Sequence, residues 1–170
     1  MNKKGFTLIE LILVMTLLSI LALVMLSNFN NSLKRGRDSQ RKNDLNQLQK
    51  ALENYYEDHH SYPTFTDIFG RKLCTNYVCL TSDTVYMIKT ATDPSPSSFK
   101  YMYVPEPTAV PVGPSSYYYL YTYIENDADQ DPNISKTGFT TNIACNVSGT
   151  AVPCRYYVSS SNAERLTANP

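Results

Sequence analysis

The sequence contains no tryptophan, only 6 glycines in 170 residues, and no excess of either charge. Its 15 lysines and arginines balance 15 aspartates and glutamates, so charge gives no general argument for nucleic-acid binding, and we predict no specific nucleic-acid partner. The sequence also lacks a glycine-rich phosphate-binding loop, a nucleophile elbow and an internal repeat. We therefore predict that the chain is not an enzyme.

The two histidines do not change this prediction. His59 and His60 are adjacent, at the expected end of a helix, so they point in different directions. They lack the i,i+4 spacing of a helical metal-binding pair. We expect them to lie in a solvated helix terminus.

The most unusual stretch is an apolar run from Phe6 to Leu26, in which Glu10 is the only charged residue. As a helix, these 21 residues span roughly 31 Å, the thickness of the hydrocarbon core of a bilayer. A single acid in such a segment is costly and requires a partner or a place near the interface. The run is longer than the apolar region of a secretory signal, and no small-residue cleavage site follows it, so we expect it to remain attached.

The segment Lys3-Lys4-Gly5-Phe6-Thr7-Leu8-Ile9-Glu10, with the apolar run behind it, resembles the class III signal of type IV pilins and pseudopilins. The resemblance implies that a prepilin peptidase removes the leader after Gly5 and that Phe6 is then methylated. It also implies that Glu10 meets the Phe6 amine of a neighbouring subunit during assembly. An acid in the first turn also complements the helix dipole. The alternative is a glutamate that snorkels to the interface of an ordinary membrane anchor.

The resemblance further implies an α+β fold in which a long N-terminal helix, with an apolar inner half and an amphipathic outer half, packs on an antiparallel β-sheet head. In this division the chain consists of a leader (1–5), a transmembrane or filament-core helix (6–26), an amphipathic continuation of the helix (27–62) and a globular β-rich head (63–170).

The residues themselves also predict the amphipathic continuation of the helix over 27–62. Apolar side chains recur at helical spacing on one face, at Leu45, Leu48, Leu52 and Tyr55. Weak helix formers in 27–36 predict a bend or partial melting there. Pro63 should end the helix, because the residue before a proline avoids the helical conformation.

A basic cluster follows the apolar run and comprises Lys34, Arg35, Arg37, Arg41 and Lys42. Counted alone, these charges would place the C-terminal part in the cytoplasm, whereas the resemblance and the cysteines place it outside. We expect the cluster to contact anionic lipid head groups before assembly or acids of adjacent subunits afterwards, or else to form a solvated helix face. Asp38 and Lys42 are also spaced as an i,i+4 ion pair.

After Pro63 the pattern becomes that of strands. We predict strands at 84–89, 99–104 and 117–124, the last with tyrosines on one face, and a final hairpin formed by 139–145 and 154–158. Proline-rich connectors at 93–96 and 105–114 should separate the first three.

The four cysteines predict disulfides in an exported domain, with three connectivities open. The simplest is local, pairing Cys74 with Cys79 and Cys145 with Cys154. A zinc site is the alternative, although the spacings are wider than zinc sites usually have.

One acidic segment, Glu125 to Asp131, resembles a cation site. Asp127, Asp129 and Asp131 alternate and could present oxygens to calcium, and major pseudopilins carry a calcium loop in this general region. Pro132 and Gly138 depart from the EF-hand pattern, and an exposed acidic turn is the alternative. No other cofactor is expected.

The predicted function is that of a pilin, the structural subunit of a type IV pilus-like helical filament. The implied partners are further copies of the chain, the prepilin peptidase and methylase, the membrane before assembly, and the pilus assembly platform. The implied location is the cytoplasmic membrane, as a single-pass protein with its head outside, and then the cell surface. A major pseudopilin of a type II secretion or DNA-uptake machine, and an anchored extracellular binding domain that never polymerises, are the alternatives.

Overall fold

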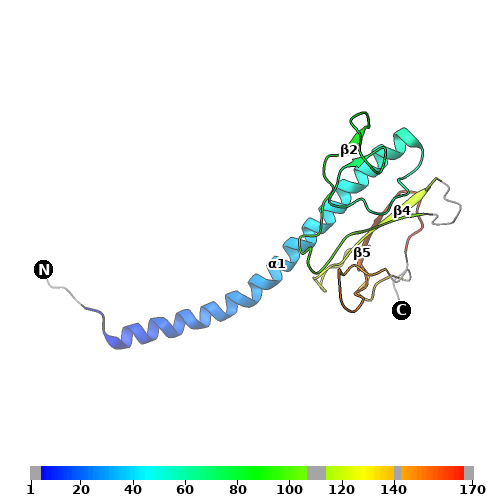
Figure 1. Cartoon of the computed structure of the whole chain (residues 1–170). Coiled ribbons are helices and arrows are strands. Elements are labelled where there is room, and N and C mark those ends of the chain that lie inside the picture. Colours follow the sequence, from blue (N-terminus) through cyan, green and yellow to red (C-terminus); the bar gives the residue numbers. More distant parts are fainter. Residues whose placement is uncertain (1–4, 107–113, 140–142, 167–170) are drawn as a thin grey trace.

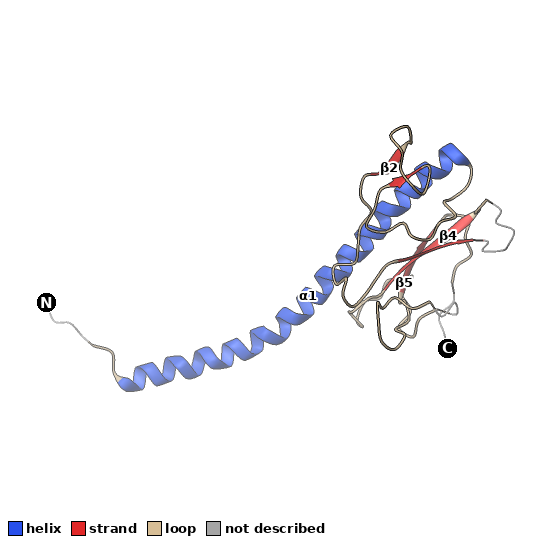
Figure 2. Ribbon diagram, in the orientation of Figure 1, coloured by secondary structure: helices blue, strands red, loops and turns tan. Residues whose placement is uncertain are grey.

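The protein is a long helix with a globular head on its C-terminal half, and its N-terminal half projects away from the head (Figure 1). The computed structural model describes residues 5–106, 114–139 and 143–166, except for the side chains of residues 24–28. Within these residues the fold is α+β, as predicted. Figure 2 shows that the strands all lie on the half of the chain that carries the head.

Helix α1 (Leu8–His59) is uninterrupted, so the predicted melting at 27–36 does not occur. Thr7 caps its N-terminus, and at the other end His60 adopts a left-handed conformation with φ of 53°. The chain then turns into Tyr62-Pro63, where the sequence predicted the end of the helix. Figure 1 shows a smooth curve along α1 rather than a sharp kink.

The head contains two antiparallel sheets. Strands β1 (Leu73–Cys74) and β2 (Val85–Met87) form a small two-stranded sheet. Strands β3 (Met102–Glu106), β4 (Tyr117–Thr122) and β5 (Tyr156–Ser159) form a three-stranded sheet with β4 in the centre.

The two faces of β4 contact two different hydrophobic clusters. Tyr118 and Leu120 point toward the helix, where they join the buried residues Leu45, Leu48 and Leu52. The alternate residues, Tyr119 and Tyr121, lie in a second cluster with Phe139, Cys145, Cys154 and Tyr157. The two-faced pattern predicted for 117–124 is therefore confirmed, and both faces are buried.

The strand predictions were correct in outline and wrong in detail. The first predicted strand shortens to 85–87, and β1, its partner, was not predicted. The second begins at Met102 instead of Phe99 and continues through Pro105. Proline is tolerated there because β3 lies at the edge of its sheet, where one row of backbone N–H groups has no ladder partner.

The predicted final hairpin is only partly formed among the described residues, and residues 140–142 lie outside them. Its two segments are joined by an antiparallel bridge between Ala144 and Pro153, a hydrogen bond from the Cys154 backbone N–H to the Ile143 carbonyl, and the disulfide between Cys145 and Cys154. Residues 156–159 pair with β4 instead. Pairing with a central strand satisfies more backbone groups than the predicted isolated hairpin would.

Candidate functional site

The N-terminal end of α1 holds the residues that the sequence analysis singled out. Residues 5–7 are not helical, and Phe6 is 87% exposed. Thr7 and Glu10 form a capping box, in which the Thr7 hydroxyl accepts from the Glu10 backbone N–H at 3.4 Å and the Glu10 carboxylate accepts from the Thr7 backbone N–H at 2.8 Å. Glu10 therefore fixes where the helix begins, and its side chain lies at the surface.

The apolar residues of the projecting half are exposed on every side of the helix. Ten of them, from Leu8 to Leu23, illustrate this with exposures between 47% and 75%: Leu8, Ile9, Leu11, Ile12, Leu13, Val14, Met15, Leu17, Leu18 and Leu23. Within the described residues, no helix combines the length and the apolar character required to cross a membrane. A contiguous apolar surface of this kind marks an interaction site.

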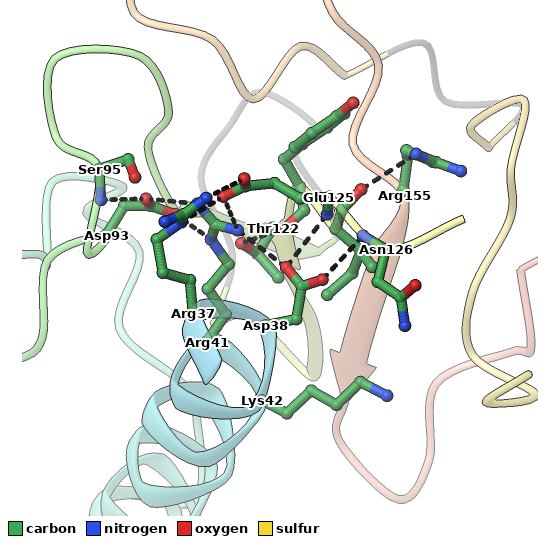
Figure 3. Close-up of polar contacts among 12 residues, drawn as sticks. Arg37, Asp38, Arg41, Lys42, Asp93, Ser95, Thr122, Glu125, Asn126 and Arg155 are labelled. Atoms are coloured by element: carbon green, nitrogen blue, oxygen red, sulfur yellow. Dashed lines mark hydrogen bonds and ion pairs between the residues drawn. The ribbon is translucent and has the colours of Figure 1, made fainter. Parts of the chain in front are cut away.

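The outer half of α1 is joined to the head by a buried ionic network (Figure 3). The Arg41 side chain is fully buried and makes a bidentate contact with Asp93, at 2.8 and 3.0 Å. It also donates to Asp38 and to Glu125, both at 2.8 Å. Arg37 contacts Glu125 through two further hydrogen bonds.

Asp38 links this network to the backbone of the head. Its carboxylate accepts the backbone N–H groups of Glu125 and Asn126, at 3.0 and 2.8 Å. The hydrogen bond from Arg37, with that from Arg41 and against an opposing effect of burial, lowers the pKa of Glu125 to about 2. The network thus attaches one turn of α1 to two loops of the head.

Sequence analysis did not find these partners. Asp93 and Glu125 are 52 and 84 positions from Arg41, and no local pattern connects residues at such distances. Arg37, Arg41 and Lys42 were expected to contact lipid, other subunits or solvent, but all three pair with acids of the head, and for the fully buried Arg41 the expectation was wrong. Lys42 does not pair with Asp38 either, because Asp38 is used by Arg41 and by the head.

The three aspartates predicted for calcium contact cations of the protein itself. Asp129 and Asp131 both accept from the Lys42 ammonium, at 2.8 and 3.1 Å, and Asp127 pairs with Arg155 at 2.7 Å. Among the described residues, no group of three acidic, histidine or cysteine side chains is arranged to hold a metal. Calcium binding remains a prediction, and any calcium ion would have to compete with Lys42.

All four cysteines form disulfides, and the predicted local pairing, Cys74 with Cys79 and Cys145 with Cys154, is confirmed. The second disulfide is buried in the second hydrophobic cluster. His59 and His60 are exposed at the end of α1, and the His59 ring lies 3.1 Å from the Tyr86 hydroxyl.

Comparison with known proteins bears on the N-terminal region first. Residues 1–26 match the family model described as the prokaryotic N-terminal methylation motif. The chain is 43% identical over 61 residues to the type IV wide pilus major component PilA4 of Thermus thermophilus. It is 33% identical over 69 residues to the type IV major pilin protein PilA of Myxococcus xanthus. The N-terminal region of the chain is therefore similar to that of type IV pilins.

The match to these pilins is partial. It covers 36% of this chain and 47% of PilA4, and 41% of this chain and 31% of PilA, so the chain spans less than half of either relative. No solved structure matches the chain significantly. Both relatives are named as pilus components, and the prediction that the chain is not an enzyme agrees with this similarity.

Proposed function

We propose that the protein is the structural subunit of a type IV pilus-like surface filament, assembled through the N-terminal half of α1 after cleavage between Gly5 and Phe6. The observation that carries the proposal is the contrast within one continuous helix. One face of its outer half is buried in the head, whereas the described side chains of its apolar half are exposed. Copies of the same helix, side by side, would cover that surface.

The location of the cleavage site is compatible with processing. Gly5 and Phe6 lie in a non-helical, exposed segment directly before the N-cap. A peptidase needs such an extended and accessible backbone. In this proposal the methylase then acts on the new amine of Phe6, while the membrane holds the subunit with its head outside until the assembly platform adds it to the filament.

Glu10 is the residue proposed to direct assembly. When apolar helices pack around it, its carboxylate loses water, and a nearby cation offsets that cost. The Phe6 amine of a neighbouring copy is the proposed cation. Inside the chain, the described partner of the Glu10 carboxylate is Thr7, which is neutral.

The experiment compares the wild type with Glu10→Val and Glu10→Gln in cells. Wild-type filaments should contain protein that begins at methylated Phe6, as read by mass spectrometry of the N-terminus. Both variants should be processed and remain in the membrane fraction, and sheared filaments should fall at least tenfold. Wild-type protein that begins at Met1 and never polymerises would refute the proposal and favour an anchored binding domain.

A pseudopilin of a secretion or DNA-uptake machine shares the same N-terminal features. Long filaments on wild-type cells favour the pilin. Loss of secretion or uptake in a deletion strain that never carried long filaments favours the pseudopilin.

A further inference from the structure

The structure divides the basic cluster of α1 into two groups. Arg37, Arg41 and Lys42 contact acids of the head, as described above. Lys34 and Arg35 are exposed, and neither forms a salt bridge in the part of the chain that the structure describes. They line a polar notch of about 260 Å³ where α1 enters the head. Two acids line the same notch and are already paired: Glu125 with Arg37 and Arg41, and Asp127 with Arg155.

Two exposed acids lie at the C-terminal end of the same helix. Glu57 and Asp58 lie in the last turn of α1, where the partial negative charge of the helix terminus makes acids unfavourable. Asp58 accepts a hydrogen bond from the Tyr86 hydroxyl at 2.7 Å, which orients it without neutralising it. Neither carboxylate forms a salt bridge within the described ranges. Local stability does not explain two acids at this position.

Helix geometry relates the two pairs of charges. Lys34 and Glu57 are 23 positions apart, and so are Arg35 and Asp58. This spacing corresponds to roughly 34 Å along the axis and roughly 140° around it, so each acid lies nearly on the opposite face from its matching cation. Lys34 and Arg35 lie near the middle of α1, and Glu57 and Asp58 lie in its last turn. Within one helix these two pairs cannot contact each other.

We propose that Lys34 and Arg35 of one copy contact Glu57 and Asp58 of a second copy, with the two helices parallel and staggered by roughly 34 Å. Parallel neighbours present opposite faces to each other, and equal spacing brings both pairs into contact in the same register. The contact is heterologous, so it continues from copy to copy instead of closing in a dimer. This inference rests on the proposed function, because it requires copies that assemble side by side.

Electrostatics sets what this contact can contribute. Exposed ion pairs are weak individually and are screened by salt. Repulsion between like charges, however, would oppose every addition of a subunit in a stagger that brought such charges together. The ion pairs therefore select which stagger two copies adopt, while contacts between apolar helices supply most of the free energy of assembly.

The test uses charge reversal in the full chain in cells. Lys34→Glu/Arg35→Glu and Glu57→Lys/Asp58→Lys should each reduce sheared filaments at least fivefold. The combination of all four changes should recover them to within twofold of wild type. The control, Lys72→Glu/Lys89→Glu, reverses two exposed cations elsewhere on the head and should leave filaments unchanged.

A cross-linking measurement tests the same contact without relying on the amount of filaments that the variants form. Lys34→Cys/Glu57→Cys should give disulfide-linked multimers within isolated filaments, because the four native cysteines are already paired. The control variant, Lys34→Cys/Lys72→Cys, should give no disulfide-linked multimers.

The outcomes separate the two proposals. Filaments that require Glu10 but ignore both charge reversals would overturn this inference alone. Loss after reversal of the cations only, without recovery in the combination, would also overturn it and would indicate that Lys34 and Arg35 contact anionic lipid head groups. Absence of wild-type filaments would overturn the proposed function itself.

Discussion

The two halves of α1 have the same secondary structure and opposite environments. Leu45 in the outer half is fully buried, whereas Leu17 in the inner half is 55% exposed, although both belong to one uninterrupted helix. The outer half obtains its partners from the same chain, through a tyrosine-rich sheet and the Arg41 network. The inner half carries more apolar residues, and those that the structure describes from Leu8 to Leu23 are exposed, which is the condition expected of a surface kept for assembly.

The largest loss of stability is expected when the charge that joins α1 to the head is removed. Arg41→Met leaves the carboxylates of Asp38, Asp93 and Glu125 without their shared cation in a buried site. We expect a loss of about 3–5 kcal/mol in the free energy of unfolding. Urea denaturation of the purified protein measures it.

Arg35→Met is the matched control for Arg41→Met, because it removes an exposed guanidinium from the same helix. Its effect on the free energy of unfolding should stay within about 0.5 kcal/mol. Equal effects of the two substitutions would contradict the role assigned to the buried network.

A second comparison tests packing in the two halves. Leu45→Ala should cost about 2–5 kcal/mol, because it opens a cavity in the core shared with β4. Leu17→Ala should change the stability of the isolated subunit by no more than about 0.5 kcal/mol. Thermal unfolding of the subunit checks both values, and a large loss for Leu17→Ala would mean that the inner half is covered by its own chain.

The disulfides allow a comparison inside the head. Cys145→Ala/Cys154→Ala should cost roughly 2–3 kcal/mol, because it releases the closed loop and also loosens the second hydrophobic cluster. Cys74→Ala/Cys79→Ala releases a shorter loop and should cost less, although Cys74 is itself buried. The reverse order in denaturation experiments would show that the β1–β2 sheet contributes more to stability than its size indicates.

The smallest effect concerns pH. Because the arginines lower the pKa of Glu125 from 4.5 to about 2, the ionised carboxylate stabilises the folded head above pH 4.5. That contribution, on the order of 2 kcal/mol, should disappear as the pH falls from 4.5 to 2. Denaturation at pH 6, 4.5 and 3 should show a smaller decrease for Glu125→Gln than for wild type. An identical decrease would exclude Glu125 as a source of the acid sensitivity.

Some features were predictable because their causes are local. The stripe of Leu45, Leu48 and Leu52 has helical spacing. The helix ends at His59, shortly before the limit that Pro63 was expected to set. The disulfides join cysteines that are near in sequence, so the simplest pairing was correct. The alternation in 117–124 likewise identified the faces of β4.

Other features depended on residues that the chain brings together from a distance. Sequence spacing predicted an ion pair between Asp38 and Lys42. In the folded protein Asp38 pairs with Arg41 instead, and Lys42 pairs with Asp129 and Asp131. The partner of β5 was mistaken for a similar reason, because pairing with the segment before it and pairing with β4 satisfy the same local pattern. Strand β1 has only two residues, too few to show any periodicity.

The sequence by itself determined the apolar first half of α1 with Glu10 at its start, the apolar stripe of the outer half, and the local cysteine pairs, because spacing along the chain controls each of them. Only the tertiary structure decided which cations of α1 are used inside the subunit and which remain at its surface. Ion pairs depend on distances between side chains in space, and these follow from the packing of helix against sheet rather than from any local pattern.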